Sequence, residues 1–304
     1  MKTIGCDPEF FVKINNNYTK AANINVPTKE DSKENKGFRV FRDNVLLEIN
    51  QPPSDNLQEF QENLRNSFIL ASEFGRIYAK SAVVFNKDIL NSKEDYEIGC
   101  HEEKCAYTLE TIDSRNLYKK NHTRTGGGHI HLGTDGDFYY NLSLVRMLDL
   151  LFSCTLIQLE KEDESSTKRR KLYGYPGRFR FTKYGIEYRV LSNYWLRSQE
   201  LTSFVYKLCD HACDLTSQDY INLFWEVDKK KIESLDFSDL NTDPIVYHNQ
   251  KFDFQDLSSL FNKVKYNKLS EKIKKMLTQE LKSDFLELES ALKDEDILRN
   301  WFNI

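Results

Sequence analysis

The chain has 304 residues and a formal net charge of −4 at pH 7, so it has no overall electrostatic attraction to nucleic acids or to anionic membranes. No segment reaches the roughly 18 consecutive apolar residues of a membrane-spanning helix, and the first twenty residues lack the apolar core of a secretion signal. The six cysteines follow no regular framework, which is typical of reduced thiols. We therefore expect a soluble, cytoplasmic protein without nucleic-acid or membrane partners.

The first predicted element is a strand, "IGCDPEFFVKI", which places two carboxylates on one face. Asp7 and Glu9 are two residues apart, and side chains with that spacing point to the same side of a strand. They are either solvated charges on an edge strand or a buried pair that needs a cation. Mg²⁺ is the usual cellular partner of carboxylate oxygens.

A polar loop over residues 28–37 leads to a second strand candidate, "FRVFRDNVLLEINQPP". A proline pair ends this strand, and apolar residues at three- and four-residue spacing then predict a helix capped by Ser54 or Asp55. Glu48 lies in the apolar part of the strand, with Asp43 five residues before it. A salt bridge and a ligand role are equally open for Glu48.

Three glycines then run directly into two histidines in "TRTGGGHIHLG". Glycines give the backbone unusual freedom and let another group approach it closely, so they predict a sharp turn into a short strand beside a ligand. His129 and His131 share one face of that strand and are either ligands of a metal or phosphate or hydrogen-bonded core residues. The segment is not a Walker-type phosphate loop, because no Gly-Lys-Ser/Thr follows, and a third zinc ligand is missing nearby.

A buried helix is predicted over residues 141–160, followed by a charged loop and the strand "YGIEYRVLSNYWL". The loop and strand are rich in basic residues, namely Lys168, Arg169, Arg170, Lys171, Arg178, Arg180, Lys183 and Arg189. A solvated loop or a nucleic-acid patch with interleaved aromatic residues would explain them, but the chain is acidic overall. Glu187 and Arg189 share a strand face, and a guanidinium beside a metal-binding glutamate suits phosphoryl transfer.

A further helix is expected over about residues 199–217, and a lysine-rich helical pattern begins near residue 254. The pattern places the boundary between the first part of the chain and the C-terminal helical part within residues 218–253. The sequence contains no internal repeat. Strands and helices are mixed without a βαβ rhythm, so the pattern favours an α+β fold with an antiparallel sheet.

Three motifs in order, "GCDPEFFV", "GGGHIHLG" and "GIEYRVLSNYWL", resemble those of the glutamine synthetase and glutamate–cysteine ligase catalytic fold. The closer resemblance is to the phage-type amidoligase family, the carboxylate–amine ligase type 2 group of phiEco32-like phages, over about residues 3–200. It implies a curved antiparallel sheet of the glutamine synthetase type with helices packed on one face. It also implies an amidoligase-like catalytic domain over residues 1–225, with residues 226–304 as a helical segment packed on it.

The resemblance implies roles for individual residues. The metal ligands would be Asp7, Glu9, Glu48, His129 and Glu187, with Asp43 as a tentative addition. Arg180 and Arg189 would grip ATP and the acyl phosphate and act with Glu187 in catalysis, while the nucleotide would contact His131, Arg170, Tyr173 and Arg180. The sequence departs from the glutamine synthetase pattern at Asp7, which is one methylene shorter than the expected glutamate, and at Gly185, which replaces an arginine.

The implied activity is an ATP- and Mg²⁺-dependent ligation, with Mn²⁺ as an alternative ion. It joins a carboxylate and an amine, each from a small molecule or a peptide, through an acyl phosphate, and the enzyme would work in the cytoplasm, that of the host if a phage encodes it. Two other functions remain open: a phosphotransferase of the guanidino-kinase type, which shares the superfold, and a catalytically inactive binding module. Product analysis separates the first, because a kinase forms a stable phosphagen and a ligase forms an amide and free phosphate.

Overall fold

The computed structural model describes residues 2–96, 102–112, 121–160, 163–216 and 294–304, with single positions between 275 and 288. Among them, strands form a 10-stranded sheet in the order β3-β4-β1-β10-β12-β11-β7-β8, with β2 and β5 also paired to β1. All of its pairs are antiparallel, which confirms the predicted α+β class. The strands of the sheet are β1 (Thr3–Ile14), β2 (Asn17–Thr19), β3 (Arg39–Asp43), β4 (Leu46–Asn50), β5 (Ile77–Tyr78), β7 (Glu103–Cys105), β8 (Thr111–Ile112), β10 (Gly128–Gly133), β11 (Arg178–Thr182) and β12 (Gly185–Tyr188), while β6 (Ala82–Val84) and β9 (Thr123–Thr125) form a separate ribbon.

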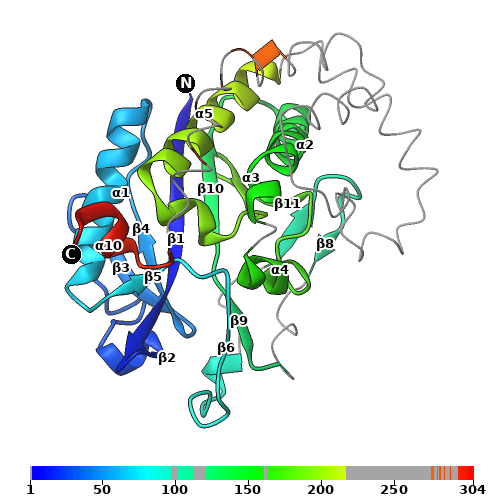
Figure 1. The fold of residues 1–304 in the computed structure, drawn as a ribbon. Coiled ribbons are helices and arrows are strands. Elements are labelled where there is room, and N and C mark those ends of the chain that lie inside the picture. Colours follow the sequence, from blue (N-terminus) through cyan, green and yellow to red (C-terminus); the bar gives the residue numbers. More distant parts are fainter. Residues whose placement is uncertain are drawn as a thin grey trace.

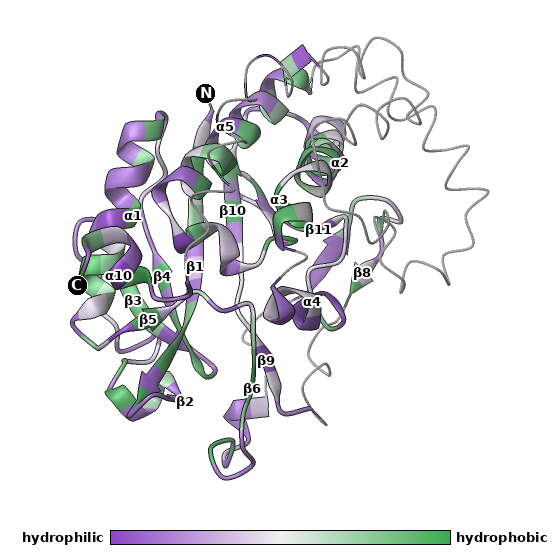
Figure 2. Ribbon diagram, in the orientation of Figure 1, coloured by the Kyte–Doolittle hydropathy of each residue, from purple (hydrophilic) through white to green (hydrophobic). Residues whose placement is uncertain are grey.

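Helices cover one face of this sheet, and Figure 1 shows α1, α2 and α5 lying over the central strands. The α-helices are α1 (Leu57–Ser72), α2 (Phe138–Cys154), α3 (Leu156–Leu159), α4 (Glu164–Arg170), α5 (Gln199–Leu215) and α10 (Ile297–Phe302), and the 3₁₀ helices are η1 (Ala21–Ile24), η2 (Glu94–Tyr96) and η5 (Asn193–Arg197). Helices α1 and α5 carry both hydrophilic and hydrophobic residues (Figure 2), as helices with one buried face do. No described helix combines the length and apolar composition needed to cross a bilayer.

The alternation of side chains along the strands separates an apolar face from a polar one. On β1, Ile4, Phe10 and Val12 belong to the core beneath the helices. On β10 and β12, Ile130 and Ile186 join the same core. The residues between them, which include the predicted ligands, therefore face the opposite side of the sheet.

The C-terminal end of the chain returns to the N-terminal half of the molecule. Helix α10 lies beside α1 and β5 (Figure 1), and the Trp301 indole donates a hydrogen bond to the Leu196 carbonyl at 2.9 Å. The Ala79 amide donates to the Glu295 carbonyl at 2.7 Å. These residues pack on the first part of the chain, but most of the predicted segment 226–304 lies outside the described residues, so its boundary stays a prediction.

Several predicted elements differ in detail from the structure. The single strand expected over residues 38–53 is a hairpin of β3 and β4, because Asn44 adopts a left-handed conformation with φ of 54° and reverses the chain. The cap of α1 is the Asn56 side chain, which accepts a hydrogen bond from Glu59. The helix expected over 141–160 breaks at Thr155, and the charged loop after it contains α4. The break near 218–253 and the helical pattern from 254 fall mostly outside the described residues.

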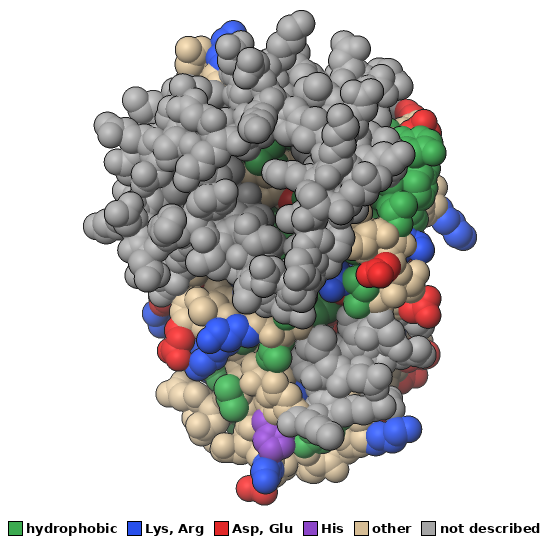
Figure 3. Space-filling view, turned by 90° about the vertical axis from the view of Figure 1, so that its right-hand side faces the viewer, with side chains coloured by type: hydrophobic (Ala, Val, Ile, Leu, Met, Phe, Trp, Pro, Cys, Tyr) green, Lys and Arg blue, Asp and Glu red, His purple; other side chains and the backbone are tan. Residues whose placement is uncertain are grey.

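Figure 3 shows one side of the molecule on which acidic and basic side chains of the described residues are interspersed rather than gathered into a patch of one sign. This distribution agrees with the small net charge of the whole sequence. Charged side chains of both signs also lie on the polar face of the sheet, where the predicted ligands are found.

Candidate functional site

The strand register places the predicted ligands next to one another. Asp7 on β1 is paired with His129 on β10. His131, two residues further along β10, is paired with Glu187 on β12, and Glu187 is paired with Arg180 on β11. Four neighbouring antiparallel strands thus present carboxylate, imidazole and guanidinium groups on one surface.

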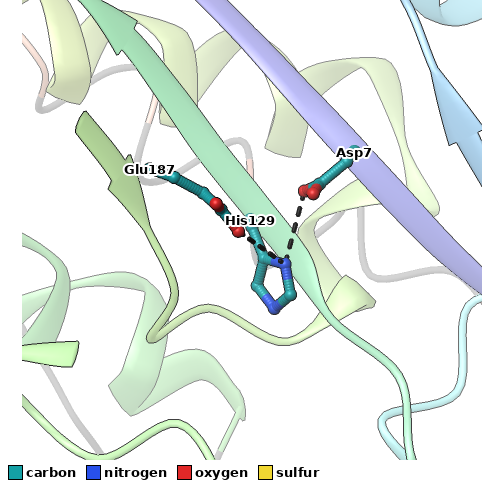
Figure 4. Close-up of side chains that lie close together, drawn as sticks. All are labelled: Asp7, His129 and Glu187. Atoms are coloured by element: carbon teal, nitrogen blue, oxygen red, sulfur yellow. Dashed lines mark ion pairs between the residues drawn. The ribbon is translucent and has the colours of Figure 1, made fainter. Parts of the chain in front are cut away.

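Asp7, His129 and Glu187 form the first cluster, which we call the histidine cluster. His129 Nδ1 lies 3.4 Å from Asp7 Oδ1 and 3.7 Å from Glu187 Oε1, and Figure 4 shows the three side chains converging from three strands. One possible ligand atom from each residue falls within 4.8 Å of the others. The side chain of His129 is only 2 % exposed, so the imidazole is held in a fixed position.

His131 extends this cluster toward the C-terminal end of β10. Its Nε2 lies 3.3 Å from Asp7 Oδ2, and its Nδ1 hydrogen-bonds the hydroxyl of Tyr184, whose ring stacks on the imidazole. Burial lowers the pKa of His131, but the charge of Asp7, its hydrogen bond and the charge of Glu187 together outweigh burial, and the pKa ends above its ordinary value. Burial likewise opposes ionisation of Asp7, yet His131 and His129 bring the Asp7 pKa well below its usual range.

Glu9, Asp43 and Glu48 form a second cluster, the acidic cluster, on the next strands of the sheet. Glu9 on β1 is paired with Glu48 on β4, and the β3–β4 hairpin brings Asp43 within 4.8 Å of both. Burial, with repulsion from Asp43, Asp7 and Glu9, raises the pKa of Glu48 well above its ordinary value. Burial also raises the pKa of Glu9 and of Asp43. The hairpin therefore explains how Asp43 reaches the site.

The three glycines before His129 let the site pack closely. A Cβ on Gly127 would lie 2.5 Å from His129 Nε2 and 3.1 Å from Glu9 Oε2, and one on Gly128 would lie 2.6 Å from Trp195 Nε1. The Gly127 amide also donates a hydrogen bond to Glu9 Oε2 at 2.6 Å. None of the three has a positive φ, so the sequence requires glycine here for close approach and not for the sharp turn we expected.

Arg180 of β11 and Arg189, directly after β12, line the site on its other side. Arg180 Nη1 lies 3.2 Å from Glu187 Oε2, and Arg189 Nη1 contacts Glu187 Oε1. Arg189 also donates to the Tyr173 hydroxyl at 2.6 Å and to Glu103 Oε2 at 3.3 Å. Glu187 is thus shared between two guanidiniums and the histidine cluster.

The two residues of the basic segment that were expected to contact the nucleotide, Arg170 and Tyr173, both bind carboxylates of the protein. Tyr173 is buried behind Arg189, and its hydroxyl donates to Glu103 Oε2 at 3.1 Å. Arg170 pairs with the buried Glu160 at 3.2 Å, so its guanidinium anchors α4. Sequence reasoning missed Glu103, because a three-residue strand is too short to show an alternating pattern.

The residues of both clusters fit divalent metal ions. Among the described residues, Asp7 Oδ1 and His129 Nε2 are buried without a hydrogen-bond partner, which is costly unless another group binds them. The carboxylates of the histidine cluster suit Mg²⁺ or Mn²⁺, and its imidazole also suits transition metals such as Zn²⁺. The three carboxylates of the acidic cluster suit hard cations. A cation would also relieve the repulsion that raises the pKa of Glu48.

No curated protein matches the sequence. A family model described as phage phiEco32-like COOH.NH2 ligase-type 2 matches residues 120–302, which is more than half of the chain. The matched region contains both histidines, Arg180, Glu187 and Arg189, whereas Asp7 and the acidic cluster precede it. The chain therefore belongs to the phiEco32-like family of carboxylate–amine ligases, type 2.

Proposed function

We propose that the protein is an ATP- and Mg²⁺-dependent ligase that joins a carboxylate to an amine through an acyl phosphate. The observation that carries this proposal is the row of groups on one face of the sheet. Two clusters suited to divalent ions lie on β1, β3, β4, β10 and β12, directly beside Arg180 and Arg189. Family membership gives the reaction class, and the row supplies groups that the reaction needs.

Residues of both clusters would bind the metal ions. Asp7, His129 and Glu187 would hold one ion, and the acidic cluster would hold a second. Mg²⁺, or Mn²⁺ in its place, would screen the negative charges of the triphosphate and the carboxylate, so that these two anions can meet. The fixed positions of the ligands would keep the ions between β1 and its neighbouring strands.

The proposed reaction has two steps. A carboxylate oxygen of the acid substrate attacks the γ-phosphorus of ATP, ADP leaves, and an acyl phosphate forms. The amine nitrogen then attacks the acyl carbon, phosphate leaves with the bonding electrons, and the nitrogen loses a proton. Arg180 and Arg189 would bind the phosphoryl oxygens and stabilise the charge that develops in both steps.

Hydroxylamine trapping tests this proposal without knowledge of the natural amine. Hydroxylamine attacks acyl phosphates to give hydroxamates, so the protein should release phosphate and form a hydroxamate when supplied with Mg²⁺, ATP and a panel of carboxylic acids. Arg180→Gln should lose this activity by roughly a hundredfold, which corresponds to about 2.7 kcal/mol of transition-state stabilisation. In a parallel assay with guanidino compounds in place of the acids, formation of a stable phosphorylated guanidine, with no hydroxamate in the first assay, would instead establish a kinase.

A further inference from the structure

Arg178 is an arginine of the same site that the proposed reaction has not used. It is the first residue of β11 and lies two residues before Arg180, so both side chains are on the polar face. Its backbone carbonyl accepts a hydrogen bond from the Arg189 amide at 3.0 Å. The three guanidiniums therefore come from neighbouring positions of β11 and of the chain directly after β12.

The Arg178 guanidinium is held only loosely by the described residues. Its side chain is 17 % exposed, and its Nε lies 3.8 Å from Glu103 Oε1, which is longer than a hydrogen bond. The group also lies near the Tyr175 ring, at 5.7 Å from the centroid. Its Nη1 is buried and has no hydrogen-bond partner among the described residues.

Two buried arginines nearby bind more protein acceptors than Arg178 does, although Arg169 Nε also has no hydrogen-bond partner among the described residues. Arg169 donates to the carbonyls of Val190 and Leu191 at 2.8 and 2.9 Å, and Arg189 is bound by Glu187, Glu103 and Tyr173. Buried guanidinium groups normally find acceptors in this way. No described residue supplies an acceptor for Arg178 Nη1, so a bound ligand can supply one.

The charges around Arg178 specify an anion as that acceptor. Next to Arg178, the guanidiniums of Arg178, Arg180 and Arg189 share two carboxylates, Glu103 and Glu187. A metal ion on Glu187 would add further positive charge. Guanidinium N–H groups form a planar fork that matches carboxylate and phosphate oxygens.

We propose that Arg178 binds an oxyanion of a substrate, separate from the reacting carboxylate. This inference rests on the proposed function, which places the reacting group at Arg180 and Arg189. Two residues along a strand span about 7 Å, so the second oxyanion would lie roughly that far from the first. A second carboxylate of the acid substrate and a more distant phosphate of the nucleotide both offer such a group.

Binding measurements distinguish these two sources. Isothermal titration with Mg²⁺ and a non-hydrolysable ATP analogue measures the nucleotide, and titration of the resulting complex with succinate, glutarate and adipate, against butyrate and pentanoate, measures the acid. Arg178→Gln should weaken one of the two by at least about tenfold. Arg178→Lys should be intermediate, because it keeps the charge and loses the fork. A loss for dicarboxylates alone identifies a second carboxylate, and a loss for the analogue alone identifies a phosphate.

A matched control and the melting temperature exclude a structural explanation. Lys183→Gln removes the same charge from an exposed position of the β11–β12 turn and should leave both affinities unchanged. Because the Arg178 guanidinium makes only a long contact with Glu103 among the described residues, Arg178→Gln should change the melting temperature of the free protein little. Unchanged affinities in Arg178→Gln, with binding intact in the wild type, would overturn the inference alone. A wild-type protein that binds neither the analogue nor any acid would overturn the proposed function and the inference with it.

Discussion

Glu48 and Glu187 are both buried glutamates of the candidate site, but their surroundings are opposite in charge. Glu48 faces Asp43 and Glu9, whereas Glu187 contacts Arg180 and the buried Arg189. In the metal-free protein Glu48→Gln removes repulsion and should raise the melting temperature. Glu187→Gln leaves a buried guanidinium without its charged partner and should cost about 1–3 kcal/mol. Thermal unfolding in EDTA measures both, and shifts in the same direction would contradict these assignments.

The raised pKa of Glu48 predicts a pH dependence with a definite sign. The pKa in the folded protein lies above the ordinary value of 4.5, so this residue's contribution to stability is present below that pH. It is lost as the pH rises toward the folded-state pKa. In EDTA, the stability advantage of Glu48→Gln over the wild type should therefore grow from pH 5 to pH 8. With saturating Mg²⁺ it should shrink or reverse, because the ion then neutralises the carboxylate. A difference that is independent of both pH and Mg²⁺ would argue against a cation in the acidic cluster.

At the scale of the elements, Asp149 connects α2 to β12 and to the start of β11 by hydrogen bonds. Its carboxylate accepts hydrogen bonds from the Gly177 amide and the Tyr188 hydroxyl, both at 2.7 Å. Burial raises the pKa of Asp149 to about 7 despite these donors. Its contribution to stability is therefore present below about pH 4 and is lost as the pH rises through about 7.

Asp149→Asn mimics the protonated acid and removes this titration. The free energy of unfolding, measured in urea, should differ little between the variant and the wild type at pH 4. At pH 8 the variant should be the more stable protein, with the difference growing by on the order of 1 kcal/mol per pH unit in between. Parallel stability curves across this range would show that Asp149 does not titrate there.

The sequence predicts some elements of the site well and others poorly. The strand of Asp7 and Glu9 and the strand of His129 and His131 follow from their alternation. The β3–β4 hairpin escapes the same reasoning, because its connection has only two residues, Asn44 and Val45, and the apolar pattern resumes directly after them. Glu103 belongs to the site because its three-residue strand, β7, pairs with β11, which is distant in the sequence. Local patterns show which face a residue occupies, whereas tertiary pairing decides which residues meet.

At the scale of the whole molecule, the sheet joins distant parts of the chain, and the C-terminus helps to hold them. Trp301 is 5 % exposed, packs edge-on against Phe68 and donates to Leu196. Nearby, Lys13 and Lys80 both pair with Glu295. Trp301→Ala should cost about 3–5 kcal/mol. Calorimetry should show one transition shifted to lower temperature, while an unchanged main transition would mean that the C-terminal segment folds independently.

The proposed function requires divalent ions at both clusters on the polar face of the sheet and nucleotide phosphates beside them. Anomalous diffraction from crystals grown with Mn²⁺ and a non-hydrolysable ATP analogue locates such ions directly. The account predicts one peak among Asp7, His129 and Glu187, a second among Glu9, Asp43 and Glu48, and phosphate oxygens against Arg180 and Arg189. A bound analogue with no anomalous peak in either cluster would contradict it.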